Sequence, residues 1–395
     1  MGEIRYIDDE KIEGKRVLLR VDFNVSLHPD HSIANDERIR QAVPTIEYLI
    51  KNHNRVIIIS HLGRPIKREK KHSLRQVSER LQSYLPKYKV RFIDEKIEKL
   101  TDMLSKQYEQ EVILLENIRF YPQEQRGDAA FARLLSRYAD VYVNDAFGVS
   151  HRPDASIVAI TQMLPSYGGL LMKKEVETIG KAVKDPTHPF VAIIGGSKIS
   201  TKLSLLSKLT EVADQLIVGG GLANTFLAAQ GFNVGRSICE YGELDDARRL
   251  FYTAVEKNTS IKLPTDVVVA RSIKDTKGTV KDIEEVNSNE LILDIGPETQ
   301  RRYEQIILGA KTIIWNGPVG YFENKAFKHG TDAIYSAIVH NERSVSIVGG
   351  GDTIAALSHK RHLEIITHIS TGGGAMLEYI EKGTLPGIDA LKISS

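Results

Sequence analysis

Arginine and histidine side chains recur in the first half of the sequence, directly after short apolar segments with the composition of buried strands. His61 and Arg64 follow one segment, Arg119 another and Arg152 a third, while Arg38 opens an amphipathic stretch. The carboxyl ends of parallel strands meet at one edge of a sheet, so these cations are expected to converge. Guanidinium groups fork onto carboxylates and phosphates, which predicts a site for a small anionic metabolite. Each arginine taken alone is better explained as a solvated surface residue, so the prediction depends on their recurrence at successive strand ends.

Glycine turns follow the apolar segments of the second half. They lie at residues 195–198, 219–221, 316–320, 349–353 and 371–374. Glycine lets the backbone approach a ligand closely, and the helix that follows offers free N–H groups, so five such turns predict a polyphosphate site. Residues 219–224 and 349–354 lack the last glycine of G-x-G-x-x-G, and no G-x-x-x-x-G-K-[ST] occurs. The site should therefore differ from a Rossmann dinucleotide pocket and from a Walker-type loop.

Three charged residues lie among these turns. Lys198 and Lys202 are four residues apart, and we expect them near one face of a helix that opens near residue 199. An anion between them would offset their repulsion, although exposed lysines on a solvated face would give the same pattern. Asp352 follows three glycines, where its carboxylate could hold Mg²⁺ against phosphate oxygens, cap a helix, or do both.

The elements that position these residues alternate between β-branched apolar runs and amphipathic stretches, which predicts parallel α/β domains. Strands are predicted at residues 16–21, 55–60, 89–93, 112–115, 140–144, 190–194, 215–218, 266–269, 291–293, 312–315, 344–348 and 365–369. Helices are predicted at residues 37–51, 74–85, 129–138, 170–183, 203–210, 243–256, 298–308 and 326–339. Asp36 is the predicted N-cap of the first helix, and Pro44 is expected to kink or break it.

Length and composition limit the class of protein. The chain has 395 residues, 42% of them hydrophobic, which favours two domains. The balance of 53 Lys+Arg against 51 Asp+Glu argues against a broad nucleic-acid-binding surface. A mean hydropathy of -0.22 without a long apolar run argues against a membrane span. With Cys239 as the single cysteine and no apolar leader, a cytoplasmic location is expected. The domain division is predicted near residues 172–186.

Eight motifs occur in the order and spacing of the phosphoglycerate kinase family, which the chain resembles from residue 16 to residue 391. They are RVDFNV at 20–25, SHLGRP at 60–65, LENIRF at 115–120, NDAFG at 144–148, GGSK at 195–198, WNGPVG at 315–320, GGGDT at 349–353 and STGGGA at 370–375. The resemblance implies two Rossmann-like parallel-sheet domains that face each other across a cleft and are joined by a long helix. Residues 1–172, with 376–395 packing back on them, would bind phosphoglycerate, and residues 186–375 would bind the nucleotide.

The resemblance also implies reversible, Mg²⁺-dependent transfer of the acyl phosphate of 1,3-bisphosphoglycerate to ADP, giving 3-phosphoglycerate and ATP, by domain closure and in-line transfer. A cytoplasmic monomer without nucleic-acid or membrane partners is expected. The implied phosphoglycerate-binding residues are Asp22, Asn24, Arg38, His61, Arg64, Arg119 and Arg152. The implied nucleotide-binding residues are Lys198, Lys202, Gly219, Gly220, Asn316, Glu323, Gly350, Gly351, Asp352 and Thr353, with Asp352 also on Mg²⁺. The implied catalytic residues are Arg38, Lys198, Lys202, Gly351 and Gly374.

Three positions depart from the family pattern. Ser26 replaces a usual proline, Ile292 replaces a small residue expected beside the adenine, and Met376 replaces a usual serine near the presumed hinge. They could loosen a loop, alter nucleotide affinity or base preference, and alter closure. Two other classes therefore stay open: a catalytically impaired scaffold of the same fold, and a nicotinamide-dependent dehydrogenase. Retention of every charged contact weighs against the scaffold, and the missing third glycine weighs against the dehydrogenase.

Overall fold

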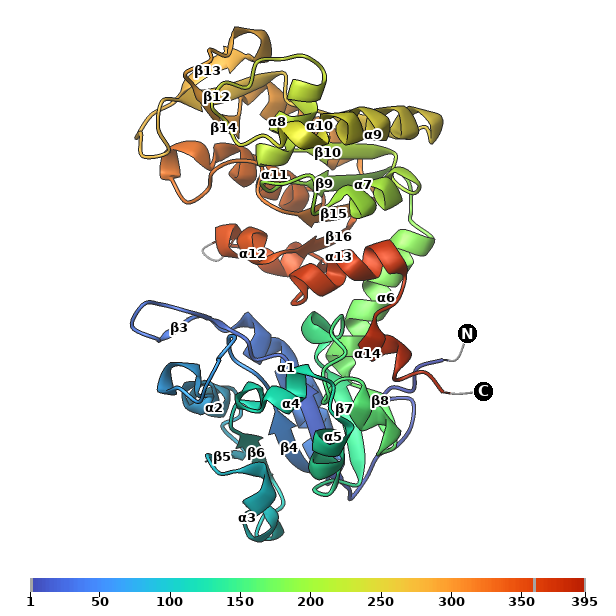
Figure 1. Cartoon of the computed structure of the whole chain (residues 1–395). Helices are drawn as coiled ribbons and strands as arrows, with labels where there is room; N and C mark the ends of the chain where they lie inside the picture. The colour runs from blue at the N-terminus through green and yellow to red at the C-terminus, as the bar shows by residue number, and fades with distance from the viewer. Residues whose placement is uncertain (1–2, 358–359, 394–395) are drawn as a thin grey trace. The chain divides into compact units, whose positions relative to one another are not determined.

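The computed structural model describes residues 3–357 and 360–393, which form two compact units (Figure 1). Unit 1 comprises Met1–Glu177 and Lys382–Ser395, and unit 2 comprises Thr178–Glu381. Each unit contains a six-stranded sheet in which all neighbouring strands are parallel. The predicted α/β fold with two parallel-sheet domains is therefore confirmed. Helix α6 (Leu170–Lys184) contains the point at which the chain passes from unit 1 to unit 2.

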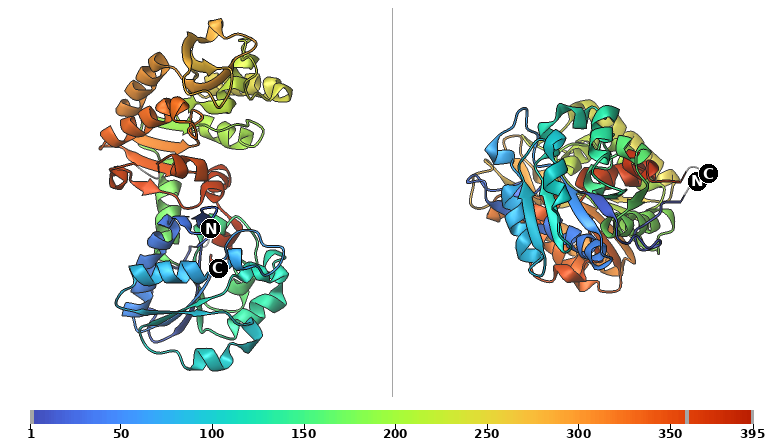
Figure 2. Two further views of the ribbon diagram at one scale, coloured as in Figure 1. Left: turned by 90° about the vertical axis from the view of Figure 1, so that its left-hand side faces the viewer. Right: turned by 90° about the horizontal axis from the view of Figure 1, so that it is seen from below.

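The sheet of unit 1 lies between two layers of helices (Figure 2). Its strand order is β5 (Lys89–Ile93), β6 (Glu111–Leu115), β4 (Arg55–Ile59), β1 (Arg16–Val21), β7 (Val141–Asp145) and β8 (Ser166–Gly168). Leu19 packs into the core with helices α1 (Glu37–Lys51) and α2 (Arg75–Tyr84). Leu18 packs into a second core with α3 (Thr101–Ser105) and α5 (Ala129–Ser136). Because both faces are buried, these strands appear in the sequence as continuous apolar runs.

The sheet of unit 2 is built in the same way. Its order is β11 (Ser260–Lys262), β10 (Gln215–Val218), β9 (Phe190–Ile194), β15 (Thr312–Asn316), β16 (Val345–Gly349) and β17 (His368–Ile369). Helices α10 (Pro297–Gly309) and α11 (His329–His340) enclose one core around the fully buried Trp315. The other helices of this unit are α7 (Leu203–Thr210), α8 (Gly220–Ala229), α9 (Leu244–Glu256), α12 (Gly351–Leu357) and α13 (Gly373–Lys382).

Unit 2 also contains a separate antiparallel sheet, in the order β13 (Thr279–Asp282), β12 (Asp266–Ala270) and β14 (Leu291–Ile295). The sequence predicted β12 and β14 as strands but placed them in the parallel pattern. Only a short loop joins β12 to β13, which allows antiparallel pairing without a crossover helix. Short elements complete the chain: β2 (Ser26–Leu27), β3 (Ile33–Asn35), α4 (Pro122–Gln125) and α14 (Pro386–Asp389).

Some local predictions were wrong. Asp36 is the N-cap residue of α1 as predicted, but its side chain does not cap the helix, because it accepts hydrogen bonds from Arg80 and from the Tyr84 hydroxyl instead. Pro44 lies inside α1, which continues unbroken to Lys51. The helix expected near residue 199 begins at Leu203, after a turn. Within the described residues, no helix is long and apolar enough to cross a bilayer.

Candidate active site

Two adjacent strands of unit 1 end beside each other and bring Asp22 and His61 together. Asp22 follows β1 and His61 follows β4, and the two strands pair in register. The Nε2 atom of His61 lies 3.9 Å from Oδ1 of Asp22. Arg38, in the first turn of α1, donates from Nη1 to Oδ2 of Asp22 at 2.6 Å. The Asp22 carboxylate therefore fixes the arginine that the sequence placed at this edge of the sheet.

Arg119 and Arg152 lie on either side of Asp154, which is almost fully buried. The Nη2 atom of Arg119 lies 3.9 Å from Oδ2 of Asp154, and the Nε atom of Arg152 lies 3.4 Å from Oδ1. Burial, with the nearby charge of Arg20, lowers the pKa of Arg119 to about 10. Arg119 is therefore a cation held away from solvent, where an anionic ligand would relieve its loss of hydration.

His61 lies inside this cluster of cations and is 1% exposed. Burial first, and then the charges of Arg20, Arg119, Arg38 and Arg152, lower its pKa well below the usual range. The imidazole is therefore neutral at physiological pH and serves as a hydrogen-bonding group among guanidinium groups. The structure thus brings together His61, Arg38, Arg119 and Arg152.

Asn24 and Arg64 lie at the margin of this cluster. Asn24 accepts a hydrogen bond of 2.8 Å from the backbone N–H of Gly63, which ties the loop after β1 to the loop after β4. Arg64 is exposed and forms no hydrogen bond or ion pair with any part of the chain that the structure describes. The predicted convergence of cations therefore holds for Arg38, Arg119 and Arg152 around His61, whereas no contact with the described residues fixes Arg64 there.

In unit 2, Lys202 points back into the first glycine turn. Its Nζ atom donates to the carbonyl oxygen of Gly195 at 2.7 Å and to Oδ1 of Asn316 at 3.1 Å. Burial lowers the pKa of Lys202 to about 8, and the charge of Asp352 partly opposes this shift. Lys198 is exposed, so the two lysines differ in environment. Their predicted common helical face is wrong, because α7 begins only after them.

Asn316 and Thr353 connect the other glycine turns. Asn316, at the end of β15, donates from Nδ2 to the carbonyl oxygen of Gly349 at 3.0 Å. The hydroxyl of Thr353 accepts a hydrogen bond of 2.7 Å from the N–H of Gly317. Gly350 has φ +103°, and a Cβ atom there would lie 2.8 Å from Nδ2 of Asn316. Glycine is therefore required at this position both by the backbone conformation and by the neighbouring amide.

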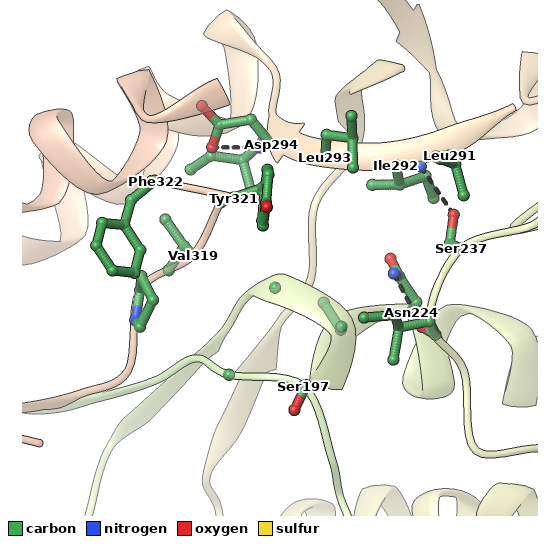
Figure 3. A pocket seen from close by; sticks show the side chains of 18 of the residues that line it. Ser197, Asn224, Ser237, Leu291, Ile292, Leu293, Asp294, Val319, Tyr321 and Phe322 are labelled. Carbon is green, nitrogen blue, oxygen red and sulfur yellow. Dashed lines mark hydrogen bonds between the residues drawn. The ribbon is translucent and has the colours of Figure 1, made fainter. Parts of the chain in front are cut away.

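A cavity of about 380 Å³ opens beside these turns. Its apolar wall comes largely from the antiparallel sheet and the segment after β15, with Leu291 and Ile292 on the side opposite Phe322 (Figure 3). Glu323 and Asp352 also line the cavity. An apolar slot flanked by a lysine, glycine turns and acidic groups suits a nucleoside whose phosphates extend toward Lys202.

The other four glycines predicted at this site differ in their surroundings. Gly220, with φ +64°, lines the cavity, whereas a Cβ atom at Gly219 would lie 2.4 Å from Cγ1 of Val319. Gly219 therefore allows close packing behind the cavity. Gly351 and Gly374 have no atom within 4 Å of the position that a Cβ would occupy. Their lack of a side chain is not required by any protein contact.

The three departures from the family pattern have distinct surroundings. Ser26 is exposed and pairs with Asn35 in the small β2–β3 ribbon. Ile292 lines the cavity, and its N–H donates to the Ser237 hydroxyl at 2.8 Å. Met376 is fully buried, and its thioether lies against Gly349, where a Cβ atom would come within 2.6 Å of it. Of the three residues, Ile292 is therefore the one placed to contact a ligand in the cavity.

The sequence missed several residues that shape both sites. In unit 1 they are Arg20, Glu124, Asp154 and Ser156, all buried beneath the cationic cluster. In unit 2 they include Asn224, Ser237 and Asp294 around the cavity. An arginine inside an apolar strand run was the available signal for Arg20. The spacing of Arg152 and Asp154 was a weaker signal, because two residues of separation do not show which cation the carboxylate contacts.

One unit thus holds an arginine-rich anion site and the other a nucleoside-sized cavity next to glycine turns, which defines an α/β phosphotransferase. The sequence profile described as "Phosphoglycerate kinase" matches residues 7–383, and the chain belongs to the phosphoglycerate kinase family. It is 46% identical over 385 residues to the phosphoglycerate kinase of Dictyoglomus turgidum, covering 97% of each chain. With that of Moorella thermoacetica it shares 45% over 396 residues, covering 98% of each.

Solved structures agree with this assignment. The phosphoglycerate kinase of Coxiella burnetii superposes with a TM-score of 0.86 at 41% identity, covering 98% of this chain and 99% of the other. That of Pyrococcus horikoshii OT3 gives a TM-score of 0.86 at 31% identity, covering 98% of both. The resemblance drawn from the eight motifs is confirmed: the protein is a kinase that acts on small molecules, and it has phosphoglycerate kinase function.

Proposed function

We propose that this chain reversibly transfers the acyl phosphate of 1,3-bisphosphoglycerate to ADP in a Mg²⁺-dependent reaction, giving 3-phosphoglycerate and ATP. The observation that carries the proposal is that the two units contain different kinds of site. Buried guanidinium groups around His61 suit a small, multiply charged acid, whereas the cavity beside Lys202 suits a nucleotide. Residues 1–172 with 376–395 are assigned to phosphoglycerate, and residues 186–375 to the nucleotide.

In the phosphoglycerate site, charged and neutral groups have different roles. Arg119 and Arg152 neutralise the anion, with Arg64 as an exposed third cation. Asn24 and His61 contribute neutral hydrogen bonds, and Asp22 orients Arg38. Arg38 is the group assigned to the transferring phosphoryl oxygens, because its guanidinium is only partly buried and is held from one side by a carboxylate.

In the nucleotide site, Lys202 and Lys198 are assigned to the phosphates and the group in transfer. Asn316 and Thr353 shape the turns that carry the amides of Gly350 and Gly351. The other proposed contacts are Gly219 and Gly220 near the base, Glu323 at the ribose, and Gly374 near the transferring group. These assignments are supported by the cavity, which Gly220, Glu323 and Asp352 line, and by Lys202, whose Nζ atom lies 3.3 Å from the position that a Cβ atom of the lining residue Gly196 would occupy.

Asp352 fits the proposed metal. It is exposed in the first turn of α12 and lines the cavity. Within the described parts of the chain, no group of three or more His, Cys, Asp or Glu side chains is placed to hold an ion alone. Mg²⁺ is commonly held by one or two carboxylates together with substrate phosphates, so a single aspartate is a sufficient protein ligand. When bound, the metal would supply neutralisation of phosphate charge.

Transfer requires the attacking oxygen to lie about 3–3.5 Å from the phosphorus of the transferring group, in line with the donor oxygen on its far side. Because each substrate is assigned to its own unit, closure of the two units is part of the proposed mechanism. The protein then contributes positioning and charge neutralisation, which phosphoryl transfer needs more than a protein nucleophile.

The test is ATP-dependent conversion of 3-phosphoglycerate, coupled to a downstream NADH-dependent dehydrogenase, with and without Mg²⁺. Turnover that requires Mg²⁺ supports the proposal. Binding of both substrates without turnover would instead indicate the impaired scaffold. A cytoplasmic monomer without nucleic-acid or membrane partners completes the proposal, and light scattering coupled to size-exclusion chromatography checks the oligomeric state.

A further inference from the structure

A fully buried ionic network lies directly beneath the phosphoglycerate site, and the mechanism above does not use it. Arg20 and Glu124 are both 0% exposed, and burial raises the pKa of Glu124, although the charge of Arg20 and hydrogen bonds from Ser156 oppose this shift. Arg20 Nε donates to the Ser156 hydroxyl at 2.9 Å, and that hydroxyl donates to Oε1 of Glu124 at 2.6 Å. Glu124 Oε2 accepts a further hydrogen bond of 3.0 Å from the Ser156 N–H.

Such a pair is a poor source of stability. Taking both charges out of water costs several kcal/mol per ion, and apolar replacements of similar volume are often neutral or stabilising. The closest approach of Arg20 to Glu124 is 3.9 Å, with the Ser156 hydroxyl bridging between them. Arg20 Nη1 donates to the carbonyl oxygen of Val21 at 2.5 Å, and Nη2 is the nitrogen nearest to Glu124 but is too distant for a hydrogen bond to it. The direction of the Nη2 donor therefore indicates the role of the network.

That donor faces His61. Arg20 Nη2 lies 3.3 Å from Nδ1 of His61, because Arg20 near the end of β1 is in register with Ile59 of the adjacent strand β4, two residues before His61. A guanidinium group can only donate hydrogen bonds. Nδ1 must therefore accept, which leaves the single proton of the neutral imidazole on Nε2.

The opposite ring nitrogen has no partner. Nε2 of His61 is buried and lacks a hydrogen bond to any described atom, since Oδ1 of Asp22 at 3.9 Å is too distant. A buried N–H without an acceptor is costly unless a ligand satisfies it. The phosphoglycerate proposed for this site supplies carboxylate and phosphate oxygens, which are acceptors only.

We propose that Arg20, held by Ser156 and Glu124, is a positioning residue that fixes His61 as the neutral Nε2–H tautomer and presents this one N–H to the anionic substrate. This inference rests on the proposed function for the identity of the substrate. The arrangement adds a neutral donor to a site to which four cations, Arg38, Arg64, Arg119 and Arg152, are assigned. The charged groups around the imidazole are Arg20, Asp22, Arg38, Arg119 and Arg152, and burial together with the four arginines lowers the pKa of His61.

The test combines NMR of the imidazole with kinetics. Long-range ¹H–¹⁵N correlation of the full-length protein without substrate reports which nitrogen is protonated, and the His61→Gln variant assigns the signals among the 12 histidines. Removing Arg20 alone would leave Glu124 buried and unpaired, so the informative variant is the double change Arg20→Met with Glu124→Gln. The matched control is Tyr142→Phe, which loses only the hydroxyl bond to the Ser156 carbonyl.

We expect wild-type His61 to be protonated at Nε2 alone at pH 7. In the double variant both tautomers should appear, the pKa of His61 should rise, and KM for 3-phosphoglycerate should increase roughly 10- to 100-fold, as for loss of a hydrogen bond to a charged group. KM for ATP should stay unchanged, and Tyr142→Phe should keep both the tautomer and KM.

Wild-type His61 protonated at Nδ1, or doubly protonated at pH 7, would overturn the inference, as would a double variant with unchanged tautomer and KM. The spectrum is recorded without substrate and therefore tests Arg20 independently of turnover. Failure of the wild-type protein to convert 3-phosphoglycerate would contradict the proposed function, while the tautomer result would still decide the role of Arg20.

Discussion

The ammonium group of Lys202 donates a hydrogen bond of 3.1 Å to Oδ1 of Asn316, so the cation is already oriented at the end of β15 in the unliganded chain. Preorganised charge of this kind lowers a barrier because it needs no rearrangement during the reaction. The burial that orients Lys202 also destabilises its charged form. Catalysis, pH dependence and stability are therefore linked at this one side chain.

Replacing Lys202 with methionine should lower kcat about 100- to 1,000-fold, the usual cost of losing one charge-stabilising donor. Single-turnover phosphoryl transfer measures the effect separately from product release. Lys208→Met is the matched control, because Lys208 lies on α7 and forms a surface ion pair with Glu211. Wild-type transfer in Lys202→Met would show that this lysine takes no part in the transfer step.

The lowered pKa of Lys202 predicts a pH effect on nucleotide binding. Below pH 8 the ammonium is charged and attracts the phosphates, whereas above pH 8 the free protein loses this charge. The Kd for MgADP should therefore increase between pH 7 and pH 9, and binding at pH 8.5 should take up protons. Calorimetry in buffers of different ionisation enthalpy measures this uptake. Lys202→Met should abolish it, and equal uptake in that variant would assign the proton to another group.

Much of the fold was predictable because buried parallel strands produce apolar runs that end in recognisable turns. Strands β1, β9 and β10 were predicted over their full lengths. The antiparallel sheet was not predicted, because the pairing of β12 with β14 depends on contacts between segments about 25 residues apart in the chain. The same sheet supplies one wall of the cavity, and Ile292 was the only residue of that wall to be predicted there.

Residues of the site were predictable where a polar side chain directly follows a strand. They were unpredictable where the side chain lies within a strand or where its role depends on contacts that form only in the folded chain. His61 belongs to the first kind, and the structure brings it and Arg38, from the first turn of α1, to Asp22. Arg20 belongs to the second, because a charged residue inside an apolar run does not reveal its partners. Lys202 stays a prediction for the nucleotide site, and the geometric reason given for it was wrong, since a turn rather than a helical face directs its side chain.

Arg38→Ala should leave the affinity for both substrates nearly unchanged and reduce kcat about 100- to 1,000-fold. We expect this because Arg38 is assigned to the negative charge that develops on the oxygens of the transferring phosphoryl group during the reaction. Arg40→Ala is the control, because Arg40 lies on the same helix and pairs with Glu37 at the surface. Isothermal titration measures affinity and a coupled assay measures kcat. A kcat equal to that of wild type would remove Arg38 from the transfer step.

Gly350→Ala should damage the nucleotide site without a change of charge. The added Cβ would meet Nδ2 of Asn316 at 2.8 Å, and the backbone has φ +103°, so Asn316 must move away from Gly349 and Lys202. We expect KM for ADP to rise at least about 10-fold, consistent with strain of about 1–3 kcal/mol. The control is Gly309→Ala, where no atom of a described neighbour lies within 4 Å of the added Cβ; it should behave like wild type. Normal nucleotide kinetics in Gly350→Ala would show that Asn316 is not needed in this position.

The raised pKa of Asp294 predicts that the stability of unit 2 falls as the pH rises toward neutrality. Burial raises its pKa to about 7, against hydrogen bonds from the N–H groups of Gly330 and Ile295 that favour the carboxylate. Between about pH 4 and pH 7 the folded state keeps a proton that the unfolded state has released. The free energy of unfolding therefore decreases across this window, by roughly 2–4 kcal/mol in total.

Trp315, the one tryptophan of the chain, lies in the core of unit 2, so its fluorescence during urea denaturation reports on that unit. Asp294→Asn cannot release a proton and should flatten the decline between pH 4 and pH 7, even though the amide loses one of the two backbone hydrogen bonds. Asp245→Asn, at a side chain that is 86% exposed, should keep the wild-type slope. The same slope in Asp294→Asn would show that this carboxyl group already ionises below pH 4, and that its two backbone N–H donors outweigh its burial.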